Sequence, residues 1–218
     1  MPVGYFLITY IRSGGFTAES VVDEAISLFN FLPVLAGGFL FSAIYTDDLN
    51  SKNLISLVGF GLSKTKIVIA KVILVTLFST VVFGLIPVFH CAVFRLLGWT
   101  VTASAWTMIY GVSLKFLLMT VAFSALSGIV VYGLQRTTFA VVTYILLAFG
   151  VISGLIATGL RTFAPSLTNY LMSGISDGIM AGVVGGGPLT LPVIEYVVYV
   201  VIAAAISVAV FYKKEMEF

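Results

Sequence analysis

The sequence predicts an all-α integral membrane protein. Of its 218 residues, 60% are hydrophobic and only 9% are charged, and the mean hydropathy is +1.16. A soluble domain carries about a quarter of its residues as charged side chains, because water must wet its surface. Long apolar runs with so few charges indicate that lipid surrounds most of the surface of this chain. The sequence therefore predicts a single transmembrane domain over residues 1–218.

Five segments are apolar enough, and long enough, to cross a bilayer, which takes about 20 residues per helix. A shorter apolar segment at residues 1–11 predicts an incomplete first span, with a re-entrant or interfacial segment as the alternative. Counting this segment, the sequence predicts about six spans, the first one short or truncated. The five full spans are expected at residues 26–45, 72–94, 113–134, 139–160 and 193–212.

The distribution of basic residues predicts the orientation, because lysine and arginine favour the cytoplasmic side of a membrane. In the six-span arrangement, seven of the 11 lysines and arginines fall on one side and four on the other. The seven lie in the loop at residues 46–71, in the turn at 135–138 and in the C-terminal tail. The sequence therefore predicts a multi-pass protein of the cytoplasmic membrane with both ends in the cytoplasm.

Composition also argues against several kinds of site. A net charge of +2 without a basic stripe predicts no nucleic-acid partner. The lone histidine, His90, excludes a His-rich metal site and is expected to be a packed side chain. Its neighbour Cys91 points about 100° away on a helix, so the two do not form a base and nucleophile pair. The segment 59–65 lacks the glycine spacing of a phosphate-binding loop, so neither a catalytic residue nor a cofactor is predicted in this chain.

The loop at residues 46–71 is the most informative segment. Asp47 and Asp48 offer acceptors for the free amides at a helix start. Leu54, Leu57 and Val58 then fall on one face of a short helix, which nearby glycines end. The pattern predicts an amphipathic helix across the inner membrane surface, followed by a Ser-Lys-Thr-Lys turn and the next span. Such a helix either docks a cytoplasmic partner or rests on anionic headgroups.

The order of these motifs resembles the permease subunits of type-2 ABC exporters. The acidic pair, the short apolar helix and Gly-Leu-Ser-Lys-Thr-Lys precede a span, and Leu-Ser-Gly-Ile-Val-Val-Tyr-Gly-Leu-Gln-Arg at 126–136 leads into another. The last helix ends in Phe-Tyr-Lys-Lys-Glu-Met at 211–216. The resemblance implies that residues 54–60 form a coupling helix in a groove of a separate ABC ATP-binding subunit. The contact residues that it implies are Asp47, Asp48, Leu54, Ile55, Leu57, Val58, Phe60, Lys64 and Lys66.

The same resemblance implies a function and its partners. Two permease chains, identical or different, would pair, and ATP and Mg would bind to the partner ATPase, so this chain is not expected to be an enzyme. The cargo would be lipophilic or amphipathic, such as a peptide, an antibiotic or a lipid-like molecule. A stand-alone secondary transporter or channel is the alternative, and an intramembrane enzyme is a third possibility. Both need ionisable or polar groups at depth, which the predicted spans largely lack.

Lys115 and Glu195 are the ionisable residues closest to the bilayer interior. They are expected to extend to the interface or to form a mutual ion pair, with a polar contact to the substrate on the outer side as the alternative.

Two further features concern packing. Gly150 and Gly154 form a GxxxG pair in the span at 139–160, which lets helices approach closely within the chain or across a dimer seam. Ser124 and Gly128 form a similar small pair. The segment 161–192 is too apolar for a solvated loop and too interrupted for a span. It is expected to form an outer re-entrant or interfacial helical hairpin, or a loop on the partner chain.

Overall fold

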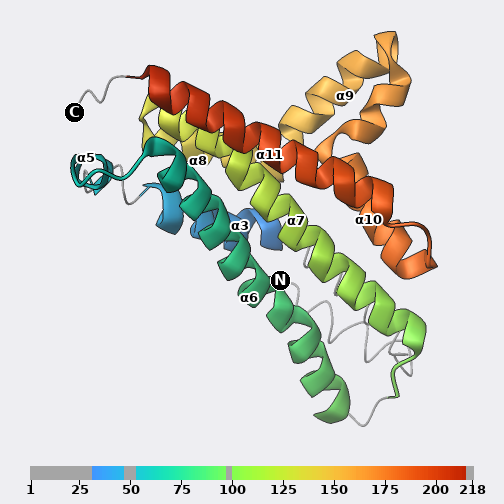
Figure 1. Cartoon of the computed structure of the whole chain (residues 1–218). Coiled ribbons are helices and arrows are strands. Elements are labelled where there is room, and N and C mark those ends of the chain that lie inside the picture. Colours follow the sequence, from blue (N-terminus) through green and yellow to red (C-terminus); the bar gives the residue numbers. More distant parts are fainter. Residues whose placement is uncertain (1–30, 47–52, 97–99, 215–218) are drawn as a thin grey trace.

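The computed structural model describes residues 31–46, 53–96 and 100–214, and within these ranges it contains helices and short connections but no strand (Figure 1). Three of the helices are long and apolar enough to cross a membrane. The chain is therefore an all-α membrane protein. The three long helices are α6 (Lys64–Leu96), α7 (Ala103–Leu134) and α11 (Thr190–Lys213).

Shorter helices fill the spaces beside the long ones. Two follow each other directly, because α3 continues as the π-helix η1. The apolar helices α8 and α9 are each too short to cross a membrane, but together they are long enough for one further span. The bounds of the shorter elements are α3 Leu32–Phe41, η1 Ser42–Thr46, α5 Asn53–Gly59, α8 Thr137–Ala148, α9 Val151–Phe163, η2 Pro165–Tyr170 and α10 Met172–Gly185.

The centre of the bundle is α7, which contacts α3, α6, α8, α10 and α11. Both α6 and α8 run antiparallel to α7, whereas α11 runs parallel to it (Figure 1). The start of α6, the end of α7 and the end of α11 therefore meet at one end of the bundle, beside α5. We call it the α5 end. The opposite end carries the end of α6 and the start of α7.

The helix that follows α5 begins earlier than predicted. The sequence predicts a turn at Ser-Lys-Thr-Lys and a span from residue 72, but α6 begins at Lys64. The side chain of Ser63 accepts a hydrogen bond from the Lys66 amide at 3.4 Å, and its carbonyl accepts one from Ile67. This serine is thus the helix cap. With 33 residues, α6 is about 50 Å long, so its lysine-bearing turns extend beyond a hydrocarbon core of about 30 Å.

Connections at the two ends of α7 also differ from the predicted bounds. α7 begins at Ala103 rather than near 113, because Thr102 caps it by accepting a hydrogen bond from the Ala105 amide at 3.3 Å. At its other end, Gln135 takes a left-handed conformation with φ 51°. The connection to α8 is therefore only two residues long, which agrees with the tight turn predicted there.

The span predicted at 139–160 is not one continuous helix. The chain breaks between α8 and α9, which are bent by 59° relative to each other. Gly150 sits at the break with φ 73°, a left-handed conformation that ends a helix and that glycine adopts without strain. A Cβ on Gly154 would meet no atom within 4 Å. The two glycines therefore do not form a packing face within the described part of the chain.

The segment predicted as an outer hairpin contains helices, as expected, but its bounds differ. Arg161 belongs to α9, which projects away from the long helices, and the chain returns through η2 and α10 along α7 and α11 (Figure 1). No residue of α9 is buried. Three spans, or four with the bent pair, lie within the described ranges, against the six predicted. The predicted partial span at 1–11 and residues 26–30 of the next one lie outside those ranges.

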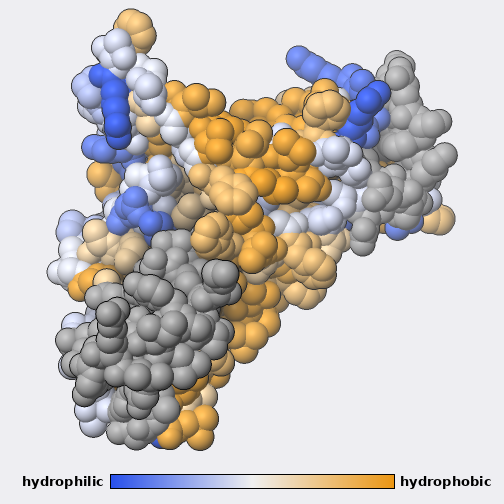
Figure 2. Space-filling model, turned by 180° about the vertical axis from the view of Figure 1, so that it is seen from behind, coloured by the Kyte–Doolittle hydropathy of each residue, from blue (hydrophilic) through white to orange (hydrophobic). Residues whose placement is uncertain are grey.

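The surface of the bundle is as apolar as the composition predicts. Seen from behind, hydrophobic residues cover the middle of the molecule, and hydrophilic ones gather toward its ends (Figure 2). Large apolar side chains such as Leu77, Phe78 and Val81 on α6 are about half exposed. Lipid is the solvent that such a surface requires.

Candidate functional site

The short helix α5 is fixed to the bundle on one side and open on the other. Leu54 is buried, and Leu57 and Val58 pack half-buried against the same core cluster. The helix ends where Gly61, at φ 85°, donates to the Val58 carbonyl while the Leu62 amide reaches back to the Leu57 carbonyl. This pair of hydrogen bonds is a common way for a helix to end. Phe60, the residue that directly follows α5, is 86% exposed.

Lys64 joins the start of α6 to the end of α11. Its Nζ donates to the carbonyl of Phe211 at 2.8 Å and to that of Lys214 at 3.2 Å. It also lies 5.0 Å from the centre of the Phe211 ring. The last carbonyls of a helix lack partners within the helix and carry partial negative charge, so a lysine is favourable there. Tyr212 adds a contact, because its hydroxyl lies 3.5 Å from Oγ1 of Thr65.

A second lysine of the same helix reaches η1. The Nζ of Lys71 donates a hydrogen bond to the carbonyl of Ile44. The π-helix is closed by Thr46, whose hydroxyl donates to the Ser42 carbonyl at 2.7 Å. Single π turns are frequently found at functional sites. The start of α6 therefore contacts two other elements through lysines, η1 and the end of α11.

An aromatic row leads from Lys64 into the core. The ring of Phe211 stacks on Tyr132 of α7 at 4.7 Å, and Tyr132 meets Tyr45 of η1 edge-on at 6.3 Å. Tyr45 stacks on Phe41 of α3 at 5.0 Å, and Phe41 stacks on Tyr144 of α8 at 5.2 Å. All five rings are almost completely buried. Closely packed rings transmit a displacement of one helix to the next, because a dense core has no space to absorb it.

The implied contact residues fall at this end of the bundle where the structure describes them. Lys66 is exposed beside Lys64, whereas Lys64 is engaged with α11. Asp47 and Asp48 lie outside the described residues, and so does the side chain of Ile55. The link from Lys64 to α11 was missed by the sequence reasoning, which considered this lysine only as a contact for a partner.

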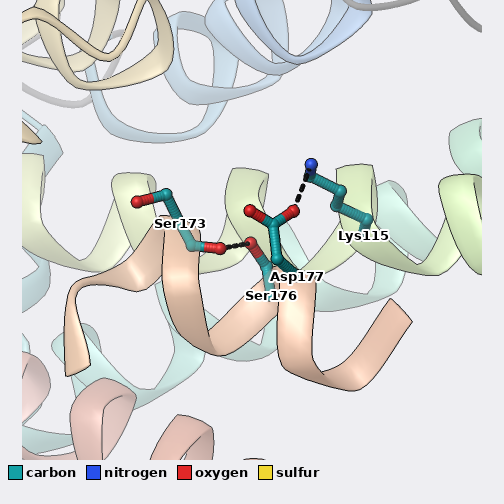
Figure 3. A network of polar contacts seen from close by, with 4 residues as sticks. All are labelled: Lys115, Ser173, Ser176 and Asp177. Atoms are coloured by element: carbon teal, nitrogen blue, oxygen red, sulfur yellow. Dashed lines mark hydrogen bonds and ion pairs between the residues drawn. The ribbon is translucent and has the colours of Figure 1, made fainter. Parts of the chain in front are cut away.

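Lys115 pairs with a different carboxylate than expected. Its Nζ lies 2.5 Å from an oxygen of Asp177 on α10 (Figure 3). Ser176, beside this aspartate, donates instead to the carbonyl of Ser173 at 2.9 Å. Glu195 is half-buried on α11. The mutual ion pair predicted between Lys115 and Glu195 is therefore wrong, because α10 lies against α7 and places its own carboxylate at the lysine.

A double-mutant cycle tests this pairing. We expect Lys115→Met and Asp177→Asn to show a coupling of about 1 kcal/mol in thermal unfolding, because the aspartate side chain is 59% exposed and exposed pairs contribute little. The matched control is Glu195→Gln, which should show no coupling with Lys115→Met. A larger coupling for Glu195 than for Asp177 would contradict the structure.

His90 is a packed side chain, as predicted. It is 7% exposed, and its Nδ1 lies 2.8 Å from the Ile86 carbonyl. The rings of Phe89 and Phe94 lie about it at 6.0 and 5.9 Å. Within the described ranges, no group of three His, Cys, Asp or Glu residues is placed to hold a metal ion.

Comparison with family models, with curated proteins and with solved structures finds no match for this chain.

Proposed function

We propose that this chain is the transmembrane permease subunit of an ATP-driven ABC exporter, and that α5 is its coupling helix. The observation that carries the proposal is the arrangement of α5, which is anchored through Leu54 and presents Phe60 at the surface. Large apolar side chains that protrude from a polar loop are typical of protein interfaces. The sequence resemblance to type-2 exporters places the ATPase contact in this same loop.

The α5 end is the cytoplasmic end in this proposal. Among the described residues, six basic side chains lie at or near it and two lie toward the opposite end, which agrees with the preference of basic residues for the cytoplasm. The six are Lys64, Lys66, Lys71, Arg136, Lys213 and Lys214, and the two are Arg95 and Lys115, whereas Arg161 lies on the projecting helix α9.

The contacts at this end supply a mechanism for coupling. ATP and Mg bind to the partner subunit, whose closure displaces α5. The start of α6 follows, because the connection between the two helices is only four residues long. Lys64 then carries the displacement to α11, and Lys71 carries it to η1 and α3. A second permease chain, identical or different, completes the passage for a lipophilic or amphipathic cargo, and the chain itself performs no hydrolysis.

Site-specific crosslinking tests this proposal. A photoreactive amino acid at Phe60 should crosslink to an ATP-binding subunit in native membranes. Mass spectrometry of the crosslinked protein should find the sequence motif of a nucleotide-binding site. Leu96, which is 87% exposed at the opposite end of α6, is the matched control and should give no such product. Crosslinks from Phe60 to lipid alone, together with ion-driven transport by the purified chain, would favour the stand-alone secondary transporter instead.

A further inference from the structure

A row of buried hydroxyls on one face of α7 sets this part of the bundle apart. Thr120, Ser124 and Ser127 share that face, because they are separated by about one helical turn, and each is at most 1% exposed. The hydroxyls of Ser124 and Ser127 have no hydrogen-bond partner among the described residues. On α6, the fully buried hydroxyl of Ser79 also has none within the described part of the chain.

Other hydroxyls of the same two helices are satisfied by their own backbone. Ser113, on the same face of α7, donates to the Ile109 carbonyl at 2.8 Å. On the outward side of α6, Thr76 and Thr80 donate to the carbonyls four residues before them, at 2.8 and 2.7 Å. A helical serine can make this bond at any position. At Ser79, Ser124 and Ser127 this bond is absent in the described part of the chain. A buried hydroxyl without a hydrogen bond destabilises the packed state, so its presence requires an explanation.

The row is covered by α3 and η1. A Cβ on Gly37 of α3 would lie 2.8 Å from the hydroxyl of Thr120, and a Cβ on Gly128 of α7 would lie 3.3 Å from the ring of Tyr45 in η1. The two elements therefore run alongside α7 from residue 120 to residue 128. The two unsatisfied serines of α7 lie between these contacts, under the covering helix.

Ser79 approaches the same row from the other wall. Because α6 runs antiparallel to α7 and the ring of Phe83 packs 6.2 Å from that of Phe116, one further turn along each helix brings Ser79 to the level of Thr120. α3 contacts both α6 and α7 (Figure 1). It therefore closes a seam that has hydroxyl groups on both walls.

We propose that this seam is a passage for polar, uncharged groups, which is closed here and opens when α3 and η1 move away from α6 and α7. The serine and threonine side chains that line it are polar but uncharged, and each hydroxyl can both donate and accept a hydrogen bond. The seam thus fits the hydroxyls and amides of an amphipathic cargo, which would supply the missing hydrogen bonds. The inference rests on the proposed function for its driving force, since η1 is held by Lys71 next to α5.

Cysteine labelling tests the opening of the seam. In a Cys91→Ser background, Ser124→Cys and Ser127→Cys are reacted with N-ethylmaleimide, a small neutral reagent, and the mass change is followed with time. The control is Ala122→Cys, because Ala122 is 0% exposed but lies about 200° around α7 from Ser124. We expect the two seam positions to react at least tenfold faster than the control, and faster still when the complex with the ATPase turns over ATP.

Equal labelling rates at all three positions, in the isolated chain and in the complex, would overturn the proposal that the seam opens. That result leaves the exporter proposal standing if Phe60 still crosslinks to the ATPase, so the two failures are distinguishable. A second measurement needs no partner. Because their hydroxyls have no partner among the described residues, Ser124→Ala and Ser127→Ala should keep or raise the Tm of the chain. A fall of more than about 5 °C would contradict the proposal.

Discussion

A Gly37→Val variant is expected to lose about 3 kcal/mol or more of its folding free energy. A Cβ at this position would lie 2.0 Å from the hydroxyl oxygen of Tyr144, far inside van der Waals contact. The ring of Tyr144 has no room to retreat, because it is fully buried and its hydroxyl donates to the Pro33 carbonyl at 2.8 Å. The helix α3 would have to separate from α8. Thermal unfolding in detergent micelles measures the loss.

The matched control for this variant is Gly84→Val. Gly84 also lies inside a helix, but a Cβ on it meets nothing within 4 Å, so its stability should change by less than about 0.5 kcal/mol. A Gly37→Ala variant should in addition be partly rescued by Tyr144→Phe, which removes the nearest atom. The double variant should lose about 1–2 kcal/mol less stability than the sum of the two single losses. Similar losses for both valine variants would refute this packing.

A Lys64→Met variant is expected to lose about 2 kcal/mol of stability. In the proposed exporter, its rate of ATP-driven transport is expected to fall at least tenfold. Methionine keeps most of the apolar stem of the side chain but removes both charge-assisted hydrogen bonds to α11 and the cation above the Phe211 ring. The start of α6 would then move without α11. Unfolding of the purified chain gives the first quantity, and transport into inverted vesicles gives the second.

Lys66→Met is the control, because Lys66 lies in the same turn of α6 with its side chain exposed. It should leave the stability of the chain near its original value. Lys64→Arg should fall between the two, since it keeps the charge but presents a planar group to carbonyls placed for an ammonium. Equal losses of stability for the two methionine variants would show that net charge at this end matters and that the link to α11 does not.

The class of the fold was predictable from composition, because a chain with 9% charged residues has too little polar surface for water to surround it. The long helices were also predictable, although their ends were not. α6 and α7 continue past their apolar runs because Ser63 and Thr102 cap them in more polar sequence. Hydropathy measures which residues lie in lipid, whereas caps decide where a helix begins.

Sequence reasoning failed where one residue fits two local roles. Gly150 fits both a GxxxG packing motif and a helix stop, and only the backbone, at φ 73°, decides between them. The partners of Lys115 and Lys64 were missed for another reason. They lie 62 and 147 residues away along the chain, so neither periodicity nor spacing connects them. Such contacts depend on how the helices pack and not on any local pattern.

The length of α8 has a consequence for how the protein enters its membrane. With 12 residues, α8 is about 18 Å long, whereas the hydrocarbon core measures about 30 Å. Left alone in lipid, its ends would expose backbone carbonyls and amides without partners. A connection of two residues joins it to α7, against which it packs. We therefore expect α8 to be retained in the membrane only when α7 is already in place beside it.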